Sequence, residues 1–248
     1  RNALYLERLP PATRAPQTHH PGLPVEWHNS TWTADRGIAF IERCAARRER
    51  FACWISFPDP HHPFDAPVPW SRLHDPAAVD LPPHRRRDLA RRPWWHRAAL
   101  EGVPETRADL RAIRETYSRM RELDDDELRE LTANYYGMIA LIDHQVGRIV
   151  ARLQALGLLD ETLLLFTSDH GDWLGDHGLV LKGPMHYDGL LRVGLLARGP
   201  GVPAGRVVTD PVSTLDLAAT FFDEPTEVVG ATLRKRRERA IDRLTAAR

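Results

Sequence analysis

Cysteine is scarce in this sequence: Cys44 and Cys53 are the only two in 248 residues. Two cysteines are too few for a disulfide framework, and their spacing does not match that of a structural zinc site. We therefore expect both thiols to be reduced and buried. A chain of this length can bury one sizeable core or two small ones, and 42% hydrophobic residues is ordinary for a soluble globular protein.

An excess of charge of either sign is also missing, since Lys plus Arg and Asp plus Glu each number 34. The overall charge therefore gives no reason for the protein to bind nucleic acid or an anionic membrane surface. No apolar stretch approaches the roughly 20 residues that a membrane-spanning helix requires. The sequence thus predicts neither a nucleic-acid partner nor a membrane partner, and partners must be inferred from local sites.

The start of the sequence, residues 1–6, lacks the long apolar core of a secretory signal peptide. This start could equally be a cut end, so the compartment stays open between cytoplasm and periplasm. Residues 1–30 are rich in Pro and His without a sustained period, and we expect a loop or lid there. A globular domain is expected over 31–223, and 224–248 form a charged, atypical tail with sparse apolar residues.

Hydrophobic periodicity predicts an alternation of helices and strands. The clearest helix runs from about Asp124 to Leu156, where apolar residues recur at intervals of three and four behind acids that favour the positive end of the helix dipole. Gly157 is expected to end it. Shorter patterns predict a helix capped by Thr33 that reaches about Ala45, a buried strand over 51–57, strands over 162–168 and 192–198, and a helix over 214–222. This order is typical of an α/β protein.

An apolar run from Leu163 to Phe166 leads to an acidic residue and an imidazole. The run suits a strand buried on both faces, as in a parallel sheet covered by helices, and such sheets bind ligands beyond the carboxyl ends of their strands. Asp169 and His170 fall at this end, and Gly171 follows where the chain must turn sharply with no Cβ in the way. A carboxylate oxygen beside an imidazole nitrogen suits a divalent cation. The pattern therefore favours a metal site.

Two further loops place reactive groups next to predicted strands. Pro60 and Pro63 restrict the backbone around His61 and His62, so these imidazoles are expected to be held in place. Lys182 lies between an apolar residue and a glycine and could be drawn toward an anion. Together the three loops would supply a cation and several imidazoles around a metal. That set of groups fits an oxyanion substrate.

Each of these residues also has a simpler interpretation. Asp169 and His170 could only cap a turn, while His61, His62 and Lys182 could be solvated side chains. The arginine-rich stretch over 84–97 includes aromatic residues, a mixture that can indicate binding of single-stranded nucleic acid. Ion pairing with the acid-rich start of the long helix is the simpler explanation. For Asp172 and Asp176, we favour holding the shape of the loop over joining the metal shell.

Five short motifs follow one another at specific spacing. They are Thr-Ser-Asp-His-Gly-Asp at 167–172, Leu-Gly-Asp-His-Gly at 174–178, Lys-Gly-Pro at 182–184, Leu-Arg-Val at 191–193 and Ala-Arg-Gly-Pro-Gly at 197–201. This series resembles the C-terminal signature of the sulfatase family, within the alkaline phosphatase superfamily. Residues 58–64 resemble the family's Pro-His-x-Pro loop, and 135–153 resemble the helix before the site strand. The resemblance covers roughly residues 25–222 and implies an alkaline-phosphatase-like, mostly parallel sheet flanked by helices, here incomplete.

The resemblance also implies roles for four residues. Asp169 and His170 would be ligands of one divalent metal, with Ca²⁺ favoured and Mn²⁺, Mg²⁺ or Zn²⁺ as alternatives. Lys182 would contact the transferred group, and His61 the ester oxygen. The family's nucleophile is a formylglycine made from Cys or Ser in a Cys/Ser-x-Pro-x-Arg motif, and a paired-acid segment near the N-terminus supplies the other metal ligands. Neither motif occurs in this sequence.

The resemblance therefore implies a sulfuric ester hydrolase that acts on a small-molecule sulfate ester. The chain would be the C-terminal part of a longer enzyme, with residues 31–223 as a partial sulfatase-like domain, and would be inert without its nucleophile. A phosphonate monoester or phosphodiester hydrolase, which shares this layout and would take a phosphonate ester, is the alternative among enzymes. A noncatalytic module that binds an oxyanion or a metal is the alternative from another class.

Overall fold

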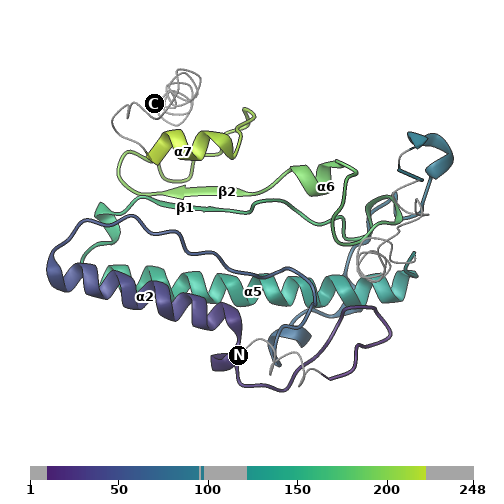
Figure 1. Cartoon of the computed structure of the whole chain (residues 1–248), viewed down its shortest axis with the longest axis horizontal. Helices are drawn as coiled ribbons and strands as arrows, with labels where there is room; N and C mark the ends of the chain where they lie inside the picture. Colours follow the sequence, from purple (N-terminus) through teal and green to yellow (C-terminus); the bar gives the residue numbers. More distant parts are fainter. Residues whose placement is uncertain (1–9, 95, 98–121, 222–248) are drawn as a thin grey trace, which may run out of the picture. The chain divides into compact units, whose positions relative to one another are not determined.

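The computed structural model describes residues 10–94, 96–97 and 122–221 (Figure 1). The predicted tail over 224–248 lies outside these residues. The chain divides into two compact units. The helical unit contains the residues up to Leu156 together with His170–Arg192, and the strand unit contains Gly157–Asp169 and the residues from Val193 onward.

Two long helices form the framework of the helical unit. α2 spans Asn29–Arg47 and α5 spans Asp125–Ala155, and they lie side by side (Figure 1). A buried polar link joins them, because the side-chain amide of Gln145 donates to Oγ1 of Thr31 at 3.1 Å. The carbonyl of the same amide accepts from Arg148 at 2.7 Å. Both groups of Gln145 are thus satisfied away from water, as a buried amide requires.

The start of α2 corrects the sequence prediction. Thr33 lies inside the helix, and His28 is the N-cap, with its Nδ1 accepting the N–H of Ser30 at 3.3 Å. Histidine is not among the preferred N-cap residues, whereas threonine is, so the sequence pattern pointed to Thr33. The earlier start gives α2 an additional turn whose Ser30 is buried.

α5 supplies the apolar face on which the helical unit is built. Its Leu128, Leu131 and Met138 are buried in one cluster with Phe64 and Leu181. Phe64 follows the His61–His62 loop by two residues, and Leu181 directly precedes Lys182. Burial of apolar side chains at this cluster therefore fixes the chain next to two of the three predicted site loops.

Both ends of α5 are defined by local signals. At the start, Asp124 and Glu127 form a reciprocal capping box: the carboxylate of Asp124 accepts the N–H of Glu127 at 2.9 Å, and the carboxylate of Glu127 accepts the N–H of Asp124 at 3.0 Å. At the other end, Gly157 follows the helix with a φ of 71°, a left-handed conformation that glycine adopts without steric cost. The predicted helix from about Asp124 to Leu156 is confirmed.

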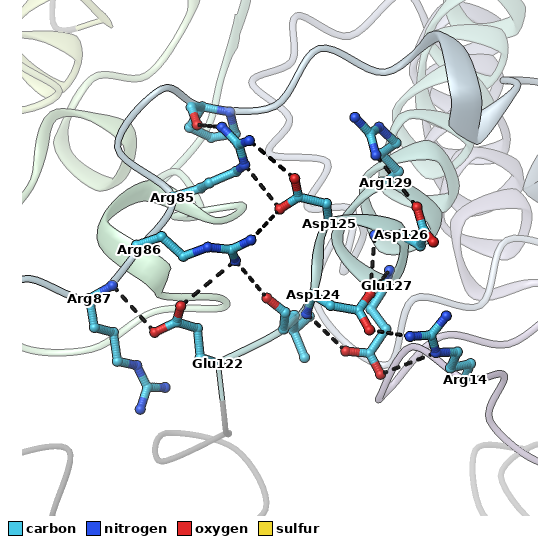
Figure 2. Close-up of polar contacts among 12 residues, drawn as sticks. Arg14, Arg85, Arg86, Arg87, Glu122, Asp124, Asp125, Asp126, Glu127 and Arg129 are labelled. Carbon is cyan, nitrogen blue, oxygen red and sulfur yellow. Dashed lines mark hydrogen bonds and ion pairs between the residues drawn. The ribbon is translucent and has the colours of Figure 1, made fainter.

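The arginine-rich stretch forms ion pairs with the start of α5 (Figure 2). Arg85 donates to both carboxylate oxygens of Asp125 at 3.0 and 3.1 Å, and Arg86 reaches the same carboxylate at 2.7 Å. Arg86 also pairs with Glu122 at 3.7 Å. The hydrogen bond from Arg85 lowers the pKa of Asp125, so the carboxyl group stays charged. Ion pairing within the protein, the simpler of the two predicted explanations, is confirmed for these arginines.

The strand unit contains the two strands of the described residues. β1 spans Leu164–Thr167 and pairs antiparallel with β2, which spans Leu195–Arg198. The predicted strands over 162–168 and 192–198 are confirmed with shorter bounds, as is the helix over 214–222, which is α7 at Leu215–Phe221. β1 is not buried on both faces, since Phe166 is exposed. A sheet of only two strands needs other elements packed on its faces to bury them. The mostly parallel sheet stays a prediction.

The predicted buried strand over 51–57 is wrong. These residues are extended but belong to no strand in the described part of the chain. Ile55 packs on Gly37, and Phe51 meets the ring of Phe40 edge-on at 6.1 Å, so the segment runs back along α2. Its other face is open, with Trp54 84% exposed. A strand becomes buried only when neighbouring strands and a second layer cover it, and periodicity in one segment cannot show whether they do.

The cysteines and the short elements complete the fold. Both thiols are free, as expected, but only Cys44 is buried, whereas Cys53 is exposed in the 51–57 segment. None of the described helices is long and apolar enough to cross a lipid bilayer.

The remaining elements are short turns of helix: η1 at Val25–Trp27, η2 at Trp70–Arg72, η3 at Pro76–Ala78, η4 at Leu89–Arg91, η6 at Leu159–Glu161, η7 at Asp176–Gly178 and α6 at Asp188–Leu191.

Candidate functional site

The predicted site residues lie on three loops. His61 and His62 follow the extended segment, and Lys182 lies between η7 and α6. Asp169 and His170 follow the end of β1 after one intervening residue, Ser168. His61, His62, His170 and Lys182 belong to the helical unit, whereas Asp169 is assigned to the strand unit.

The Asp169–His170 pair has the chemistry of two metal donors. Asp169 is exposed, and its carboxylate accepts the hydroxyl of Ser168 at 3.4 Å. His170 is half-buried, with Nδ1 2.7 Å from the carbonyl oxygen of Gly171. A carbonyl only accepts, so Nδ1 carries the hydrogen and the lone pair of the neutral ring is on Nε2. A hydrogen bond from one ring nitrogen to a backbone carbonyl is the usual way in which a metal-binding histidine is oriented.

The turn after His170 packs directly on α6. The N–H of Gly171 donates to the carbonyl of Leu190 at 2.8 Å, and a Cβ at Gly171 would lie only 2.0 Å from the carbonyl oxygen of Gly189. Glycine is therefore required here because the two backbones approach closely. The expectation that a Cβ would be in the way is confirmed.

Lys182 is carried by a loop whose backbone is fixed on both sides of it. Leu181 is buried, and its carbonyl accepts the N–H of Trp173 at 3.1 Å. On the other side, a Cβ at Gly183 would lie 2.7 Å from the Trp173 ring, whose Nε1–H donates to the carbonyl of Met185 at 3.1 Å. Trp173 thus holds the loop before and after Lys182.

Asp172 lies at the base of this loop. Its carboxylate accepts the N–H of Leu174 at 3.0 Å. Burial raises the pKa of Asp172 to about 6, against the lowering effects of the backbone of Leu174 and Leu181 and of Lys182 and His170. Asp172 holds the shape of the loop, as favoured from the sequence, but its closeness to Lys182 was not predicted.

His61 and His62 form a stacked pair. Their ring centroids are 4.1 Å apart at an angle of 28°, and Nδ1 of exposed His61 donates to the carbonyl of His62 at 2.6 Å. Burial, with smaller contributions from His61 and Lys182, lowers the pKa of half-buried His62 to about 4. His62 is therefore neutral near pH 7 and lies within electrostatic reach of Lys182. The two loops also pack on one apolar cluster, through Phe64 and Leu181.

A buried carboxylate that sequence analysis missed anchors the His61–His62 loop to the start of α2. The hydroxyl of Ser30 donates to Oδ2 of Asp59 at 2.6 Å, and Nδ1 of His28 lies 3.6 Å from the same oxygen. Burial raises the pKa of Asp59 to about 6 and lowers that of His28. The position of Asp59 between two prolines, two residues before His61, was the signal that could have drawn attention to it.

A cluster of rings lies at the far end of the Lys182 loop. Tyr187 stacks on His177 with centroids 4.0 Å apart, and its hydroxyl lies 3.3 Å from Nδ1 of buried His96. The guanidinium of Arg92 is 5.4 Å from the Tyr187 ring and pairs with Asp88 through two hydrogen bonds, at 3.0 and 2.6 Å. The second half of the arginine-rich stretch is therefore also used inside the protein.

A divalent cation needs more donors than Asp169 and His170 provide. Ca²⁺ takes about six to eight oxygen ligands, and Zn²⁺ about four ligands. Over residues 10–94, 96–97 and 122–221, no group of three or more His, Cys, Asp or Glu side chains could hold a metal ion. The tautomer of His170 fits a metal ligand, but the described residues do not complete a coordination sphere. The paired-acid segment implied by the resemblance would have to supply the rest.

Comparison with solved structures defines the class of protein. The phosphonate monoester hydrolase SpPMH from Silicibacter pomeroyi matches with a TM-score of 0.70 and 27% identity, over 99% of this chain and 49% of that protein. The fold is therefore that of the sulfatase-like and alkaline-phosphatase-like α/β hydrolases. A two-stranded sheet is a small part of such a fold, which agrees with a chain that spans half of its neighbour.

The chain belongs to the sulfatase family, whose family model, described as Sulfatase, matches residues 12–224. An uncharacterized sulfatase, YidJ of Escherichia coli (strain K12), is 30% identical over 195 residues, which are 77% of this chain and 35% of the relative. An arylsulfatase of Clostridium perfringens is 30% identical over 200 residues, 79% of this chain and 38% of the relative. The chain therefore spans well under half the length of these curated relatives.

Proposed function

We propose that this chain is the part of a sulfuric ester hydrolase that carries the anion-binding lysine, the leaving-group histidine and two metal ligands. One observation supports this proposal most: the loops that carry Lys182 and the His61–His62 pair, far apart in the sequence, pack on one apolar cluster of the helical unit, and Lys182 lies within electrostatic reach of His62. Both loops depend on the same apolar cluster, through Phe64 and Leu181. Membership of the sulfatase family gives this arrangement its chemical interpretation.

The two groups suit the charges that develop when a sulfate ester is cleaved. Negative charge is spread over the nonbridging oxygens and builds on the leaving oxygen. The ammonium of Lys182, held on a fixed loop, would stabilise the nonbridging oxygens without reorganisation. His61 would hydrogen-bond or protonate the leaving oxygen, a role worth roughly 10²- to 10⁴-fold in rate when the group is well placed.

The local geometry of the stacked pair supports the role of His61. Because Nδ1 of His61 donates to the carbonyl of His62, the nitrogen that would face a substrate is Nε2. The other ring of the pair, His62, is neutral near pH 7. A proton for the leaving oxygen would then come from Nε2 of His61.

Asp169 and His170 would hold a divalent metal, with His170 binding through Nε2. When bound, such a metal would act as a Lewis acid on the sulfuryl oxygens. Ca²⁺ is the favoured ion, with Mn²⁺, Mg²⁺ or Zn²⁺ as alternatives. The remaining donors would come from outside the described residues, and no part of the proposed roles of Lys182 and His61 depends on them.

The chain as given is proposed to be inert. No Cys/Ser-x-Pro-x-Arg segment occurs in the sequence, so the family's formylglycine cannot be formed in this chain. Lys182, His61 and the metal pair would then bind an oxyanion without transferring it. A noncatalytic oxyanion- or metal-binding module is the second interpretation that this absence favours.

A phosphonate monoester hydrolase is the alternative enzyme. The supporting observation is that SpPMH matches 99% of this chain, which is more than either curated relative covers. A tetrahedral phosphonate ester presents the same kind of oxyanion to Lys182 and the same kind of leaving oxygen to His61. The two reactions therefore differ in substrate rather than in the residues proposed here.

Hydrolysis assays test these proposals in two steps. The purified chain, supplied with Ca²⁺ or Mn²⁺, is expected to release no 4-nitrophenol from 4-nitrophenyl sulfate or 4-nitrophenyl phenylphosphonate. If turnover is observed, it should be tested in Lys182→Ala and in Asp188→Asn, a change at an exposed carboxylate. Turnover that is lost only in Lys182→Ala would disprove the inertness of the chain but support the proposed role of Lys182.

The second step uses a chain extended through any upstream reading frame that encodes a Cys/Ser-x-Pro-x-Arg segment. Hydrolysis of the sulfate is expected, with kcat/KM lowered roughly 10²-fold or more by Lys182→Ala. A clear preference for the phosphonate would select the alternative enzyme. Turnover of neither ester, or an upstream frame without the segment, would leave the noncatalytic module.

A further inference from the structure

His62 has no part in the proposed reaction, although it contacts His61 at two points. The two imidazole rings are stacked, with centroids 4.1 Å apart at an angle of 28°, and the backbone carbonyl of His62 accepts Nδ1–H of His61 at 2.6 Å. We propose that His62 is a positioning residue for His61: its ring and its carbonyl hold the His61 ring in one orientation, with Nε2 left for the leaving oxygen. The inference rests on the proposed function of His61 and adds a residue that acts through it.

The His61 ring needs such support because it is exposed. An exposed side chain exchanges between rotamers, and fixing one of them costs conformational entropy. A neutral imidazole also exchanges between two tautomers, and the hydrogen bond that one nitrogen makes decides which form is present. A fixed ring plane and a fixed Nδ1–H bond remove both freedoms before a substrate binds, so that a catalytic group is already oriented.

His62 can hold the exposed ring because its own surroundings are fixed. Its side chain is half-buried, and the chain continues after one residue into Phe64, which is fully buried. The N–H of Phe64 donates to the carbonyl of Gln17 at 2.7 Å, and the carbonyl of Phe64 accepts the side-chain amide of buried Asn134 at 3.2 Å. The backbone that carries His62 is therefore tied to the core of the helical unit.

The charge state of His62 agrees with this role. Two stacked imidazolium rings with centroids 4.1 Å apart would repel each other, so a ring that supports a protonated His61 has to be uncharged. Burial, with smaller contributions from His61 and Lys182, lowers the pKa of His62 to about 4. Near pH 7 His62 therefore presents a neutral aromatic face to His61, whether or not His61 is protonated.

Variants at position 62, the variable position of the Pro-His-x-Pro loop, test the stack. Nuclear magnetic resonance of a chain labelled at histidine with ¹³C and ¹⁵N measures the tautomers, and His61→Gln identifies the signals of His61 among the 12 histidines. At pH 8 the Nδ1–H form of His61 should dominate in the unchanged chain. In His62→Ala the ratio of the Nδ1–H to the Nε2–H form should fall roughly two- to tenfold, the range expected for loss of an aromatic pair. His62→Phe retains a ring and the carbonyl and should keep the ratio within about twofold.

His74→Ala is the matched control. His74 is also a half-buried histidine of the helical unit, and its ring meets that of Tyr136 with centroids 5.7 Å apart. A general loosening of the chain after loss of an imidazole would affect both alanine variants alike. The His61 signals should therefore stay unchanged in His74→Ala.

The proposal would be overturned by a mixture of tautomers at His61 in the unchanged chain, or by an unchanged ratio in His62→Ala with the chain folded by circular dichroism. An equal fall in His74→Ala, or a fall in His62→Phe as large as in His62→Ala, would also overturn it. If His62→Ala does not fold, His62→Leu, which fills similar space without a ring, takes its place. None of these measurements uses turnover, so a failure here leaves the hydrolase proposal standing, and an inactive extended chain leaves the positioning of His61 standing.

Discussion

Asp59 is a carboxylate held away from water directly behind the His61–His62 loop. Its side chain is 7% exposed, and burial raises its pKa from 3.8 to about 6. The folded chain therefore binds this proton more tightly than the unfolded chain does. The stability that the group contributes is fully present below about pH 3.8 and is lost as the pH rises through about 6. A raised pKa of this size corresponds to about 3 kcal/mol at neutral pH.

Asp59→Asn should remove this pH dependence. The amide oxygen can still accept the hydroxyl of Ser30, but the group no longer ionises. We expect a free energy of unfolding higher than that of the unchanged chain at pH 8, by up to about 3 kcal/mol. The difference should shrink toward zero as the pH approaches about 4. Urea unfolding at the two pH values measures it.

The matched control for Asp59→Asn is Asp188→Asn, because Asp188 is exposed. This variant should unfold like the unchanged chain at both pH values. An Asp59→Asn variant that is equally destabilised at pH 8 and at low pH would contradict the argument. Such a result would mean that the carboxylate of Asp59 contributes to stability through its hydrogen bonds alone and that its ionisation does not lower the free energy of unfolding.

At the residue scale, the sequence draws attention to the proposed reactive groups but not to the buried acids near them. His61 and Lys182 stand in short motifs that draw attention by their type and neighbours. Asp59 and Asp172 are recognisable only through their burial and through the groups that they bind, and burial depends on contacts with residues distant in the sequence. The packing of the His61–His62 loop and the Lys182 loop on one apolar cluster is of the same kind.

At the scale of elements, α5 carries its own start signal. Asp124 accepts the N–H of Asp126 and of Glu127, and it also pairs with Arg14. Asp124→Ala should therefore lower the free energy of unfolding by about 1 kcal/mol, the usual cost of a lost N-cap. Asp126→Ala changes an exposed acid in the same turn that caps nothing, and its effect should be several-fold smaller. Equal effects of the two variants on urea unfolding would show that the acids stabilise α5 through the helix dipole and not through the cap.

Helix α5 could be predicted almost to the residue, and the strand over 51–57 could not. A helix satisfies its backbone hydrogen bonds within one segment, so the periodicity, the acidic start and Gly157 contain nearly all the information. A strand satisfies them only with a neighbour. Residues 51–57 show the right composition and pack one face on α2, but the described chain places no strand beside them. For the same reason, β1 and β2 were found in sequence while their antiparallel pairing was not.

At the scale of the whole molecule, the described residues include large apolar side chains that are exposed in both units. Trp54 is 84% exposed in the helical unit, and Leu196 is 68% exposed in the strand unit. The curated relatives are far longer than the part that this chain matches. An extended segment with open backbone groups and an exposed aromatic side chain is a template on which another strand can form.

The isolated chain should therefore associate with itself through the 51–57 segment. Sedimentation velocity over a range of concentrations is expected to show growing oligomers for the unchanged chain and a shift toward monomer for Trp54→Lys, because a charge on an open edge opposes strand addition. Trp27→Lys is the control, since Trp27 is 61% exposed but lies in η1, where its N–H is already bonded to Pro24. An unchanged chain that stays monomeric, or a control that is equally effective, would show that the backbone of 51–57 is not the contact. Association through this segment would mean that residues 51–57 form the predicted strand only when a neighbouring chain provides a strand with which they can pair.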